Sequence, residues 1–157
     1  FHSEYLHSLF LRNDLIQGRF RVNRKRIALS DIHTPMFVVG TVTDHISPWR
    51  SVYKLHLFCD TEITFVLTSG GHNAGIVSEP GHAGRSYQMR TRYPHDKYLT
   101  SESWQEKAPF FNGSWWPAWQ KWLVSQSSAP LKPPKLGNSR KGYPPLCDAP
   151  GTYVFQK

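Results

Sequence analysis

The apolar positions of the chain gather in two short runs that predict buried β-strands. The first run, residues 34–40, reads Thr-Pro-Met-Phe-Val-Val-Gly, and a continuous apolar stretch bounded by proline and glycine is typical of a strand buried on both faces of a parallel sheet. The second run, residues 62–68, is rich in β-branched and aromatic side chains, which favours another buried strand.

A crossover helix is predicted between these two strands. Ser47 followed by Pro48 is the preferred order of an N-cap and a first helical residue. Residues 49–58 then form an amphipathic pattern about three turns long, with a buried stripe of Trp49, Val52, Tyr53 and His56. Because a crossover joins parallel strands, we expect an α/β fold in which the loops after both strands share one edge of the sheet.

The two ends of the chain are predicted to be a hairpin and a tail. Residues 19–29 alternate basic and apolar side chains around Asn23, which indicates an exposed hairpin. Residues 126–157 are rich in serine, proline and lysine and hold half of the 12 prolines, so they predict an extended tail. We therefore expect a body over residues 1–125, followed by the tail.

Tryptophans are concentrated shortly before the tail. Five of the 6 tryptophans fall within residues 104–122. The spacing of Trp115, Trp119 and Trp122, with Pro117 near the start, favours a helix that packs on the body over an aromatic ligand site.

The composition is that of a folded, basic chain. Its 157 residues suit one domain with its own core. Cys59 and Cys147 lack a CxxC spacing, which excludes a disulfide scaffold and a cysteine zinc site and fits a reducing cytosol. The 19 basic and 11 acidic residues give a net charge of +8, which attracts phosphates, CoA esters, nucleic acids or anionic lipids.

Nucleic-acid binding, a metal site and a membrane-spanning segment are not expected. No nucleic-acid-binding motif accompanies the basic run at residues 19–26, and the 8 histidines show no metal-ligand spacing. The apolar runs are far shorter than the roughly 20 residues that a transmembrane helix needs. We therefore expect no nucleic acid, no metal ion and no transmembrane segment.

Asp44 and His72 follow the first and second predicted strands, in that order along the chain. An α/β-hydrolase site has its acid and then its histidine in this order, and a carboxylate beside a histidine favours the imidazolium that forms during nucleophilic catalysis. Glycines on both sides of His72 permit a sharp loop. The alternative interpretation is a helix-capping Asp44 and an ordinary loop histidine, and the spacing alone leaves both open.

Four motifs stand around these residues: DHISPW at 44–49, SGGHNAG at 69–75, GSWWPAW at 113–119 and APGTYV at 149–154. Together they resemble the C-terminal part of the poly(3-hydroxyalkanoate) synthases, most closely those of class I type. The resemblance covers nearly the whole chain, including residues 5–6 and 11–15.

The resemblance implies an α/β-hydrolase fold in which residues 1–33 are the end of a cap region. It implies that a cysteine takes an acyl group from 3-hydroxyacyl-CoA and passes it to a growing polyester, with no further cofactor. By match of motif, His72 is the general base and Asp44 the catalytic aspartate, which activates the 3-hydroxyl of the incoming unit directly or through His72. His45 lies near the site or has only a structural role.

The nucleophile of that family is missing from this chain. It stands in a G-x-C-x-G elbow, whereas Cys59 and Cys147 have no such surroundings and are expected to be inert thiols. The chain opens on Phe1 without a signal-peptide pattern, which favours a fragment or a processed chain. We expect the isolated chain to be inactive and to expose an unpaired strand edge.

The resemblance also implies partners and a location for the complete enzyme. These are the remaining N-terminal part of the synthase, a second subunit in a homodimer, and polyester granules in the cytoplasm. The phosphates of CoA are one interpretation of Arg85, Arg90 and Arg92, and an ordinary solvated edge is the other.

Two other functions remain open. One is an esterase or polyester depolymerase that uses water as the acyl acceptor. The other is a non-catalytic fragment that binds a granule or a partner protein. The sequon at Asn112 is interpreted as accidental.

Overall fold

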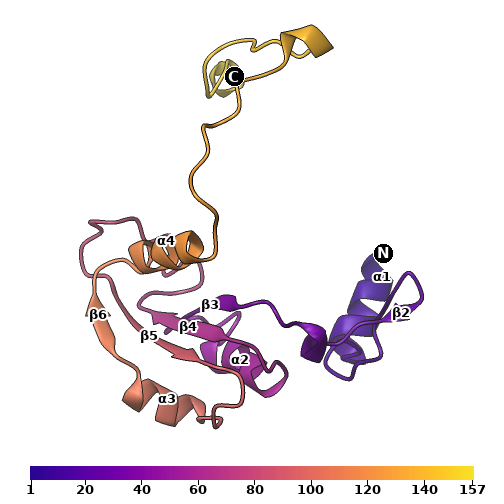
Figure 1. Ribbon diagram of the computed structural model, residues 1–157, viewed down its shortest axis with the longest axis vertical. Coiled ribbons are helices and arrows are strands. Elements are labelled where there is room, and N and C mark those ends of the chain that lie inside the picture. Colours follow the sequence, from indigo (N-terminus) through magenta and orange to yellow (C-terminus); the bar gives the residue numbers. More distant parts are fainter. The chain divides into compact units, whose positions relative to one another are not determined.

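The computed structural model describes Phe1–Lys157 as two compact units, Phe1–Gln126 and Ser127–Lys157. The first unit is built around one four-stranded sheet with the order β3-β4-β5-β6 (Figure 1). Its strands are β3 (Met36–Thr41), β4 (Ile63–Thr68), β5 (Ser86–Arg92) and β6 (Phe110–Asn112). The observed mixture of strands and helices is that of an α/β fold.

Strands β3 and β4 are parallel, as the crossover pattern predicts. Their register pairs Met36 with Ile63 and Thr41 with Thr68, so both strands end at the same edge of the sheet. Gly40 lies where β3 meets the crossover helix, and a Cβ at this position would come within 2.9 Å of the Trp49 Cβ. Glycine at position 40 therefore allows the helix to pack directly on the strand.

The crossover helix is shorter than predicted. Helix α2 (Trp49–Tyr53) gives way to a 3-10 turn, η3 (Lys54–Leu57), instead of running to residue 58. The Arg92 guanidinium donates hydrogen bonds to the carbonyls of His56 and Cys59 at 2.6 and 2.9 Å, which satisfies carbonyls at the end of the turn.

The predicted N-cap of this helix is also wrong. The N-cap is Pro48, without a side-chain hydrogen bond, rather than Ser47. The backbone N–H of Ser47 instead donates to the Asp44 carboxylate at 2.8 Å. Ser47 therefore belongs to the turn that Asp44 organises.

The sheet continues with two antiparallel strands that the hydrophobic pattern does not predict. Strand β5 pairs with β4, and β6 pairs with β5. Helix α3 (Ser101–Lys107) lies between them in the chain. Its N-cap is Thr100, whose hydroxyl accepts a hydrogen bond from the Ser103 N–H at 3.2 Å.

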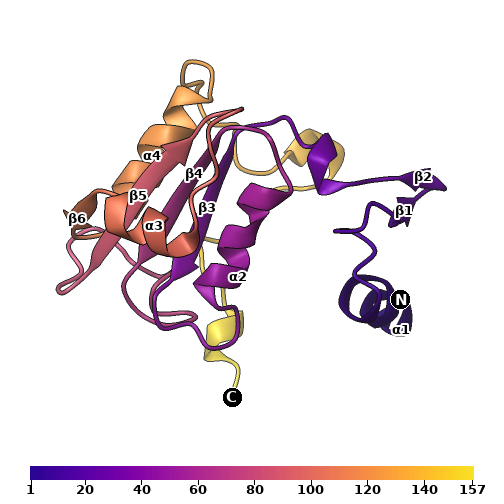
Figure 2. The ribbon, with the colours of Figure 1, turned by 90° about the horizontal axis from the view of Figure 1, so that it is seen from below.

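Helices cover both faces of the sheet. Figures 1 and 2 show α2 and α3 on one face and α4 (Trp116–Ser125) on the other. On the first face, Phe65 makes edge-to-face contacts with Tyr53 and Trp104, each with ring centroids 5.1 Å apart. The buried cluster there consists of Trp49, Tyr53, Phe65, Leu67, Trp104 and Ala108, and it supplies the main apolar core.

Helix α4 packs on the sheet as predicted. Phe37 of β3 contacts Trp115 and Trp122, with ring centroids 6.2 and 5.6 Å apart. Trp119 packs against Trp115 but remains 40% exposed. The tryptophan stripe is thus a packing surface, and two of its three members face the strand.

Strand β3 is an edge of the sheet. It pairs only with β4, and Met36–Val39 are only half-buried. Side chains pack on both faces of β3, Phe37 against α4 and Val38 against the main core. The predicted full burial of this run is nevertheless not reached, because no strand pairs with the outer edge of β3. The expected unpaired strand edge is confirmed.

The N-terminal segment contains the predicted hairpin. Helix α1 (His2–Tyr5) continues into a π-helix, η1 (Leu6–Leu11). Strands β1 (Arg21–Val22) and β2 (Lys25–Arg26) follow, and their turn residues Asn23 and Arg24 have positive φ angles of 48° and 65°. All helices fall short of the length and apolar character that a membrane-spanning segment needs.

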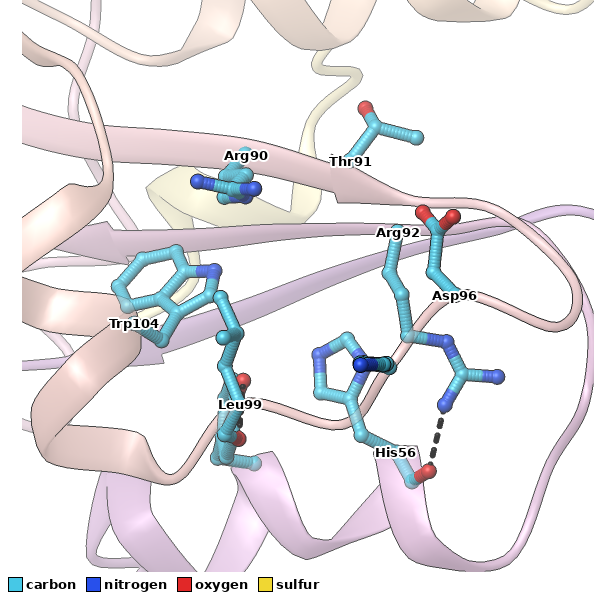
Figure 3. A pocket seen from close by; sticks show the side chains of 9 residues that line it. His56, Arg90, Thr91, Arg92, Asp96, Leu99 and Trp104 are labelled. Atoms are coloured by element: carbon cyan, nitrogen blue, oxygen red, sulfur yellow. Dashed lines mark hydrogen bonds between the residues drawn. The ribbon is translucent and has the colours of Figure 1, made fainter.

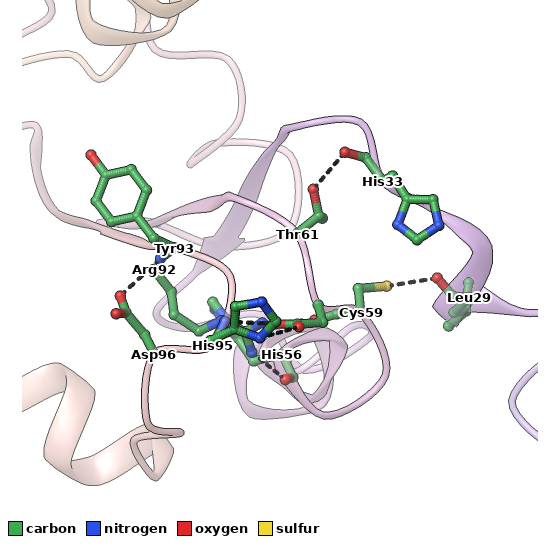
Figure 4. Close-up of polar contacts among 10 residues, drawn as sticks. Leu29, His33, His56, Cys59, Thr61, Arg92, Tyr93, His95 and Asp96 are labelled. Atoms are coloured by element: carbon green, nitrogen blue, oxygen red, sulfur yellow. Dashed lines mark hydrogen bonds and ion pairs between the residues drawn. The ribbon is translucent and has the colours of Figure 1, made fainter.

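Two hydrogen bonds attach the end of this segment to the sheet unit (Figure 4). The Cys59 thiol donates to the carbonyl of Leu29 at 3.2 Å, and the Thr61 hydroxyl donates to the carbonyl of His33 at 2.9 Å. Leu29 lies in the 3-10 turn η2 (Leu29–Asp31).

The second unit, Ser127–Lys157, has little regular structure. It contains the 3-10 turns η4 (Ser139–Lys141) and η5 (Tyr153–Phe155) and one bridge between Asn138 and Tyr143. Nearly all of its residues are exposed.

Candidate active site

Asp44 and His72 meet at the edge where β3 and β4 end. Nδ1 of His72 lies 2.9 Å from Oδ2 of Asp44. The backbone pairing continues past the strands, with Thr43 N donating to the carbonyl of Gly70 at 3.1 Å. This extra pairing keeps the two loops in register, so the expected meeting of the carboxylate and the imidazole is confirmed.

The Asp44 carboxylate is held from both sides. Its Oδ1 accepts hydrogen bonds from the N–H groups of Ile46 and Ser47 at 2.9 and 2.8 Å, while Oδ2 faces His72. The Ser47 hydrogen bond, with further help from His72 and Ile46, lowers the pKa of Asp44 from 3.8 to about 2 against the opposing effect of desolvation. Asp44 therefore stays ionised at every ordinary pH.

Because an ionised carboxylate only accepts hydrogen bonds, the contact assigns the proton to Nδ1 of His72. A neutral His72 then has an unprotonated Nε2 that can accept another proton. The His72 side chain is 44% exposed, whereas that of Asp44 is 7% exposed. The pair thus combines a buried, fixed acid with an imidazole that a reacting group can approach, which is the arrangement that general-base chemistry needs.

The loop that carries His72 is folded tightly on itself. Gly70 has a φ of +103°, and a Cβ on it would come within 2.9 Å of the Gly75 nitrogen. A Cβ on Gly75 would lie only 2.5 Å from Cγ2 of Thr41. Glycine at both positions therefore lets the loop turn back against the end of β3.

Two tryptophans donate hydrogen bonds to backbone carbonyls at the end of the same loop. The indole N–H of Trp115 donates to the Gly75 carbonyl at 3.0 Å, and that of Trp116 donates to the Ile76 carbonyl at 2.9 Å. The Ser114 hydroxyl donates to the carbonyl of Ser78 and accepts from the Trp116 N–H. Packing is predicted from the sequence for Trp115, but the polar role of Trp115 and Trp116 is not, and the adjacent Trp-Trp pair is its only sequence signal.

The other candidate residues are not part of the pair. His45 is exposed and makes no hydrogen bond. The Arg92 guanidinium donates to carbonyls at the end of η3. Arg90 and Arg92 lie toward the end of β5 that pairs with the start of β4. Both are therefore at the opposite end of the strands from His72. Arg85 precedes β5 and lies at the His72 end, because the adjacent Ser86 pairs with Ser69.

The thiols differ in environment. Cys59 is buried, donates its S–H to Leu29, and has a pKa raised by burial, so it is a poor nucleophile. Cys147 is exposed and belongs to the second unit.

No protein-family model matches the chain, but several curated proteins do. It is 36% identical over 156 residues to the "Poly(3-hydroxyalkanoate) polymerase subunit PhaC" of Rhizobium etli, covering 99% of this chain and 24% of that protein. It is 36% identical over 156 residues to the "Poly(3-hydroxyalkanoate) polymerase" of Methylorubrum extorquens, covering 99% of this chain and 25% of that protein. The chain is 33% identical over 155 residues to the "Poly(3-hydroxyalkanoate) polymerase subunit PhaC" of Cupriavidus necator, covering 98% of this chain and 25% of that protein.

The chain therefore spans about a quarter of the length of these relatives. The match extends over nearly all of this chain, as the four sequence motifs suggest. The resemblance to the poly(3-hydroxyalkanoate) synthases is confirmed.

Proposed function

We propose that this chain is the C-terminal part of the α/β-hydrolase catalytic domain of a poly(3-hydroxyalkanoate) synthase. In this proposal Asp44 and His72 act on a cysteine carried by the remaining part of the enzyme. The single observation that carries the proposal is the 2.9 Å contact between Nδ1 of His72 and Oδ2 of Asp44, at the strand edge where ligands of open α/β sheets bind.

Two further observations support a missing part. The outer edge of β3 is unpaired, and its apolar residues are half-buried, so another strand can extend the sheet there. The relatives are about four times as long as this chain. A nucleophile on an added neighbouring strand would belong to the same sheet as Asp44 and His72.

His72 is the general base of the acylation step. Nε2 takes the proton of the cysteine thiol, and the thiolate attacks the thioester carbonyl of 3-hydroxyacyl-CoA. The bond between the carbonyl carbon and the CoA sulfur breaks, and the CoA thiolate recovers the proton from Nε2. The products are an acyl thioester on the cysteine and free CoA.

His72 also serves the transfer step. Nε2 takes the proton of a 3-hydroxyl group, and the resulting oxygen nucleophile attacks a cysteine-bound acyl group. An ester bond forms as the carbon–sulfur bond breaks, and the cysteine thiolate recovers the proton. Each cycle extends the polyester by one unit.

Asp44 acts through His72 rather than directly on the hydroxyl. Its Oδ1 is occupied by two backbone N–H groups, its Oδ2 faces Nδ1 of His72, and its side chain is only 7% exposed. A carboxylate held in this way orients the imidazole and stabilises the imidazolium. The low pKa of Asp44, about 2, also makes it a weak base.

Incubating the complete protein with 3-hydroxybutyryl-CoA tests the proposal by its products. The synthase proposal expects CoA release together with insoluble polyester. CoA release with only free 3-hydroxybutyrate would show that water is the acceptor and identify an esterase. No CoA release under conditions where the protein is folded would contradict both enzymatic functions and favour a non-catalytic binding role.

A further inference from the structure

A polar cavity lies at the opposite end of the strands from Asp44 and His72. It has a volume of about 260 Å³ and is bounded by η3, the end of β5 and the segment that leads into α3 (Figure 3). Because β5 is antiparallel to β4 and pairs Arg92 with Ile63, this cavity is at the start of the parallel strands. It is therefore distinct from the proposed catalytic site.

We propose that this cavity binds a small organic oxyanion, a molecule with a phosphate or carboxylate group on a short polar body, between His56, Arg90 and Lys97. Arg90 and Lys97 line the cavity and are exposed. Neither makes an ion pair or a side-chain hydrogen bond within the chain, so both are available to an anion. The one carboxylate on the lining, Asp96, accepts a hydrogen bond from the Tyr93 N–H at 2.9 Å.

Arg92 forms a fixed cationic wall. Its guanidinium is held by the His56 and Cys59 carbonyls and by the Asp60 carboxylate, the last at 3.2 Å. Figures 3 and 4 show this side chain beside His56. Arg92 therefore adds positive potential to the cavity without having to reorganise when an anion enters.

His56 is a buried histidine whose ring nitrogens have no hydrogen-bond partner in the chain. Its side chain is 4% exposed, and neither Nδ1 nor Nε2 has a hydrogen-bond partner. Burial, reinforced by Arg92, lowers the pKa of His56 to about 4, so the ring is neutral and offers one donor and one acceptor. Buried polar atoms in native proteins are nearly always paired, and the His56 ring lines the cavity. Because both nitrogens have almost no exposed surface, the ring turns toward the cavity when a ligand supplies these partners.

The remaining walls define the size and character of the ligand. Tyr53, Leu99 and Trp104 form the apolar side of the cavity, and the Tyr53 hydroxyl is committed to the Leu99 carbonyl at 3.0 Å. The specific polar contacts with the ligand therefore come from His56, Arg90 and Lys97. The ligand therefore combines an anionic end for the two free cations with a hydroxyl-bearing body for His56.

Calorimetric titration of the complete protein tests this site. Glycerol 3-phosphate and glycerate are suitable probes because they share a hydroxylated body and differ in the anion. Sodium chloride at matched ionic strength corrects for general charge effects. We expect saturable binding of at least one probe, and the tighter one identifies the anion.

Four variants assign the binding to the cavity. Arg90→Gln and Lys97→Met should each weaken binding at least about tenfold, because each removes a charge-assisted contact. His56→Leu should weaken it similarly, with circular dichroism as the check of its folding. Lys54→Met, an exposed lysine on the same 3-10 turn that does not line the cavity, is the matched control and should bind as the unmodified protein does.

Two results would overturn the proposal. One is the absence of saturable binding by either probe above the chloride control. The other is binding that is unchanged by both Arg90→Gln and Lys97→Met, which are surface changes and leave the core intact. Turnover of 3-hydroxybutyryl-CoA tests a different edge of the sheet, so failure of one proposal is distinguishable from failure of the other.

Discussion

The indole N–H of Trp115 donates a hydrogen bond to the Gly75 carbonyl, 40 positions earlier in the chain, at 3.0 Å. The same ring packs on Phe37 of β3. One side chain therefore joins helix α4, the strand before Asp44 and the loop that carries His72, which makes it a positioning residue for the pair.

Trp115→Phe should keep the aromatic packing and lose the hydrogen bond. The Gly75 carbonyl is then left without its buried donor, which should cost about 1–3 kcal/mol of unfolding free energy. Turnover should fall, because the loop no longer fixes His72, while the pH profile keeps its shape. The measurements are thermal unfolding and turnover against pH in the complete protein.

Trp119→Phe is the control for this change, since Trp119 is 40% exposed and does not hold the loop. Equal effects of the two substitutions would contradict a positioning role for Trp115.

The Asp44 contacts predict an acid-dependent part of the stability. The folded-state pKa of about 2 lies below the ordinary value of 3.8, so the stabilisation is fully present above about pH 4. It is lost as the pH falls through about 2. Between pH 5 and pH 2, urea unfolding should show a smaller decrease in the free energy of unfolding for Asp44→Asn than for the unmodified protein. An identical pH dependence in both would contradict the assigned hydrogen bonds.

His56 predicts a pH dependence in a different range. Its folded-state pKa of about 4 lies below the ordinary 6.5, so below pH 6.5 the unfolded chain binds a proton that the folded chain does not. Stability should therefore decrease as the pH falls from 6.5 to 4, by at most about 1.4 kcal/mol per pH unit for this one group. His56→Phe should flatten this part of the curve. An unaltered slope would show that His56 is protonated in the folded protein.

The isolated 157-residue chain should not transfer acyl groups. Cys59 is buried with its S–H donated to Leu29 and its pKa raised, and we assign the nucleophile to the missing part. Release of CoA from 3-hydroxybutyryl-CoA by the purified chain, compared with the complete protein, is the measurement. Thiol-dependent release that disappears in Cys59→Ala or Cys147→Ala would refute the assignment.

The strands and loops around Asp44 and His72 are the part of the fold that the sequence predicts well. Their signals are local: a bounded apolar run for each strand and a crossover segment between them. Parallel pairing then brings Asp44 and His72 to one edge without any further information.

The antiparallel half of the sheet depends on contacts that are not local. Strand β5 carries polar and apolar side chains without a clear pattern, and it is paired through β4, where the Thr64 and Thr91 hydroxyls lie 2.8 Å apart. The short α2 helix has a similar cause, because its end is held by Arg92, 36 positions after His56. Neither partner can be identified from the neighbouring residues alone.

The most direct test of the account is the turnover number of the complete protein with 3-hydroxybutyryl-CoA after His72→Ala. His82→Ala is the matched control, because His82 also pairs through Nδ1 with a carboxylate, that of Glu79 at 2.8 Å. We expect His72→Ala to lower turnover by roughly 10²–10⁴-fold with the fold intact, and His82→Ala to leave it nearly unchanged. Equal activity of the two variants would contradict the role given to His72.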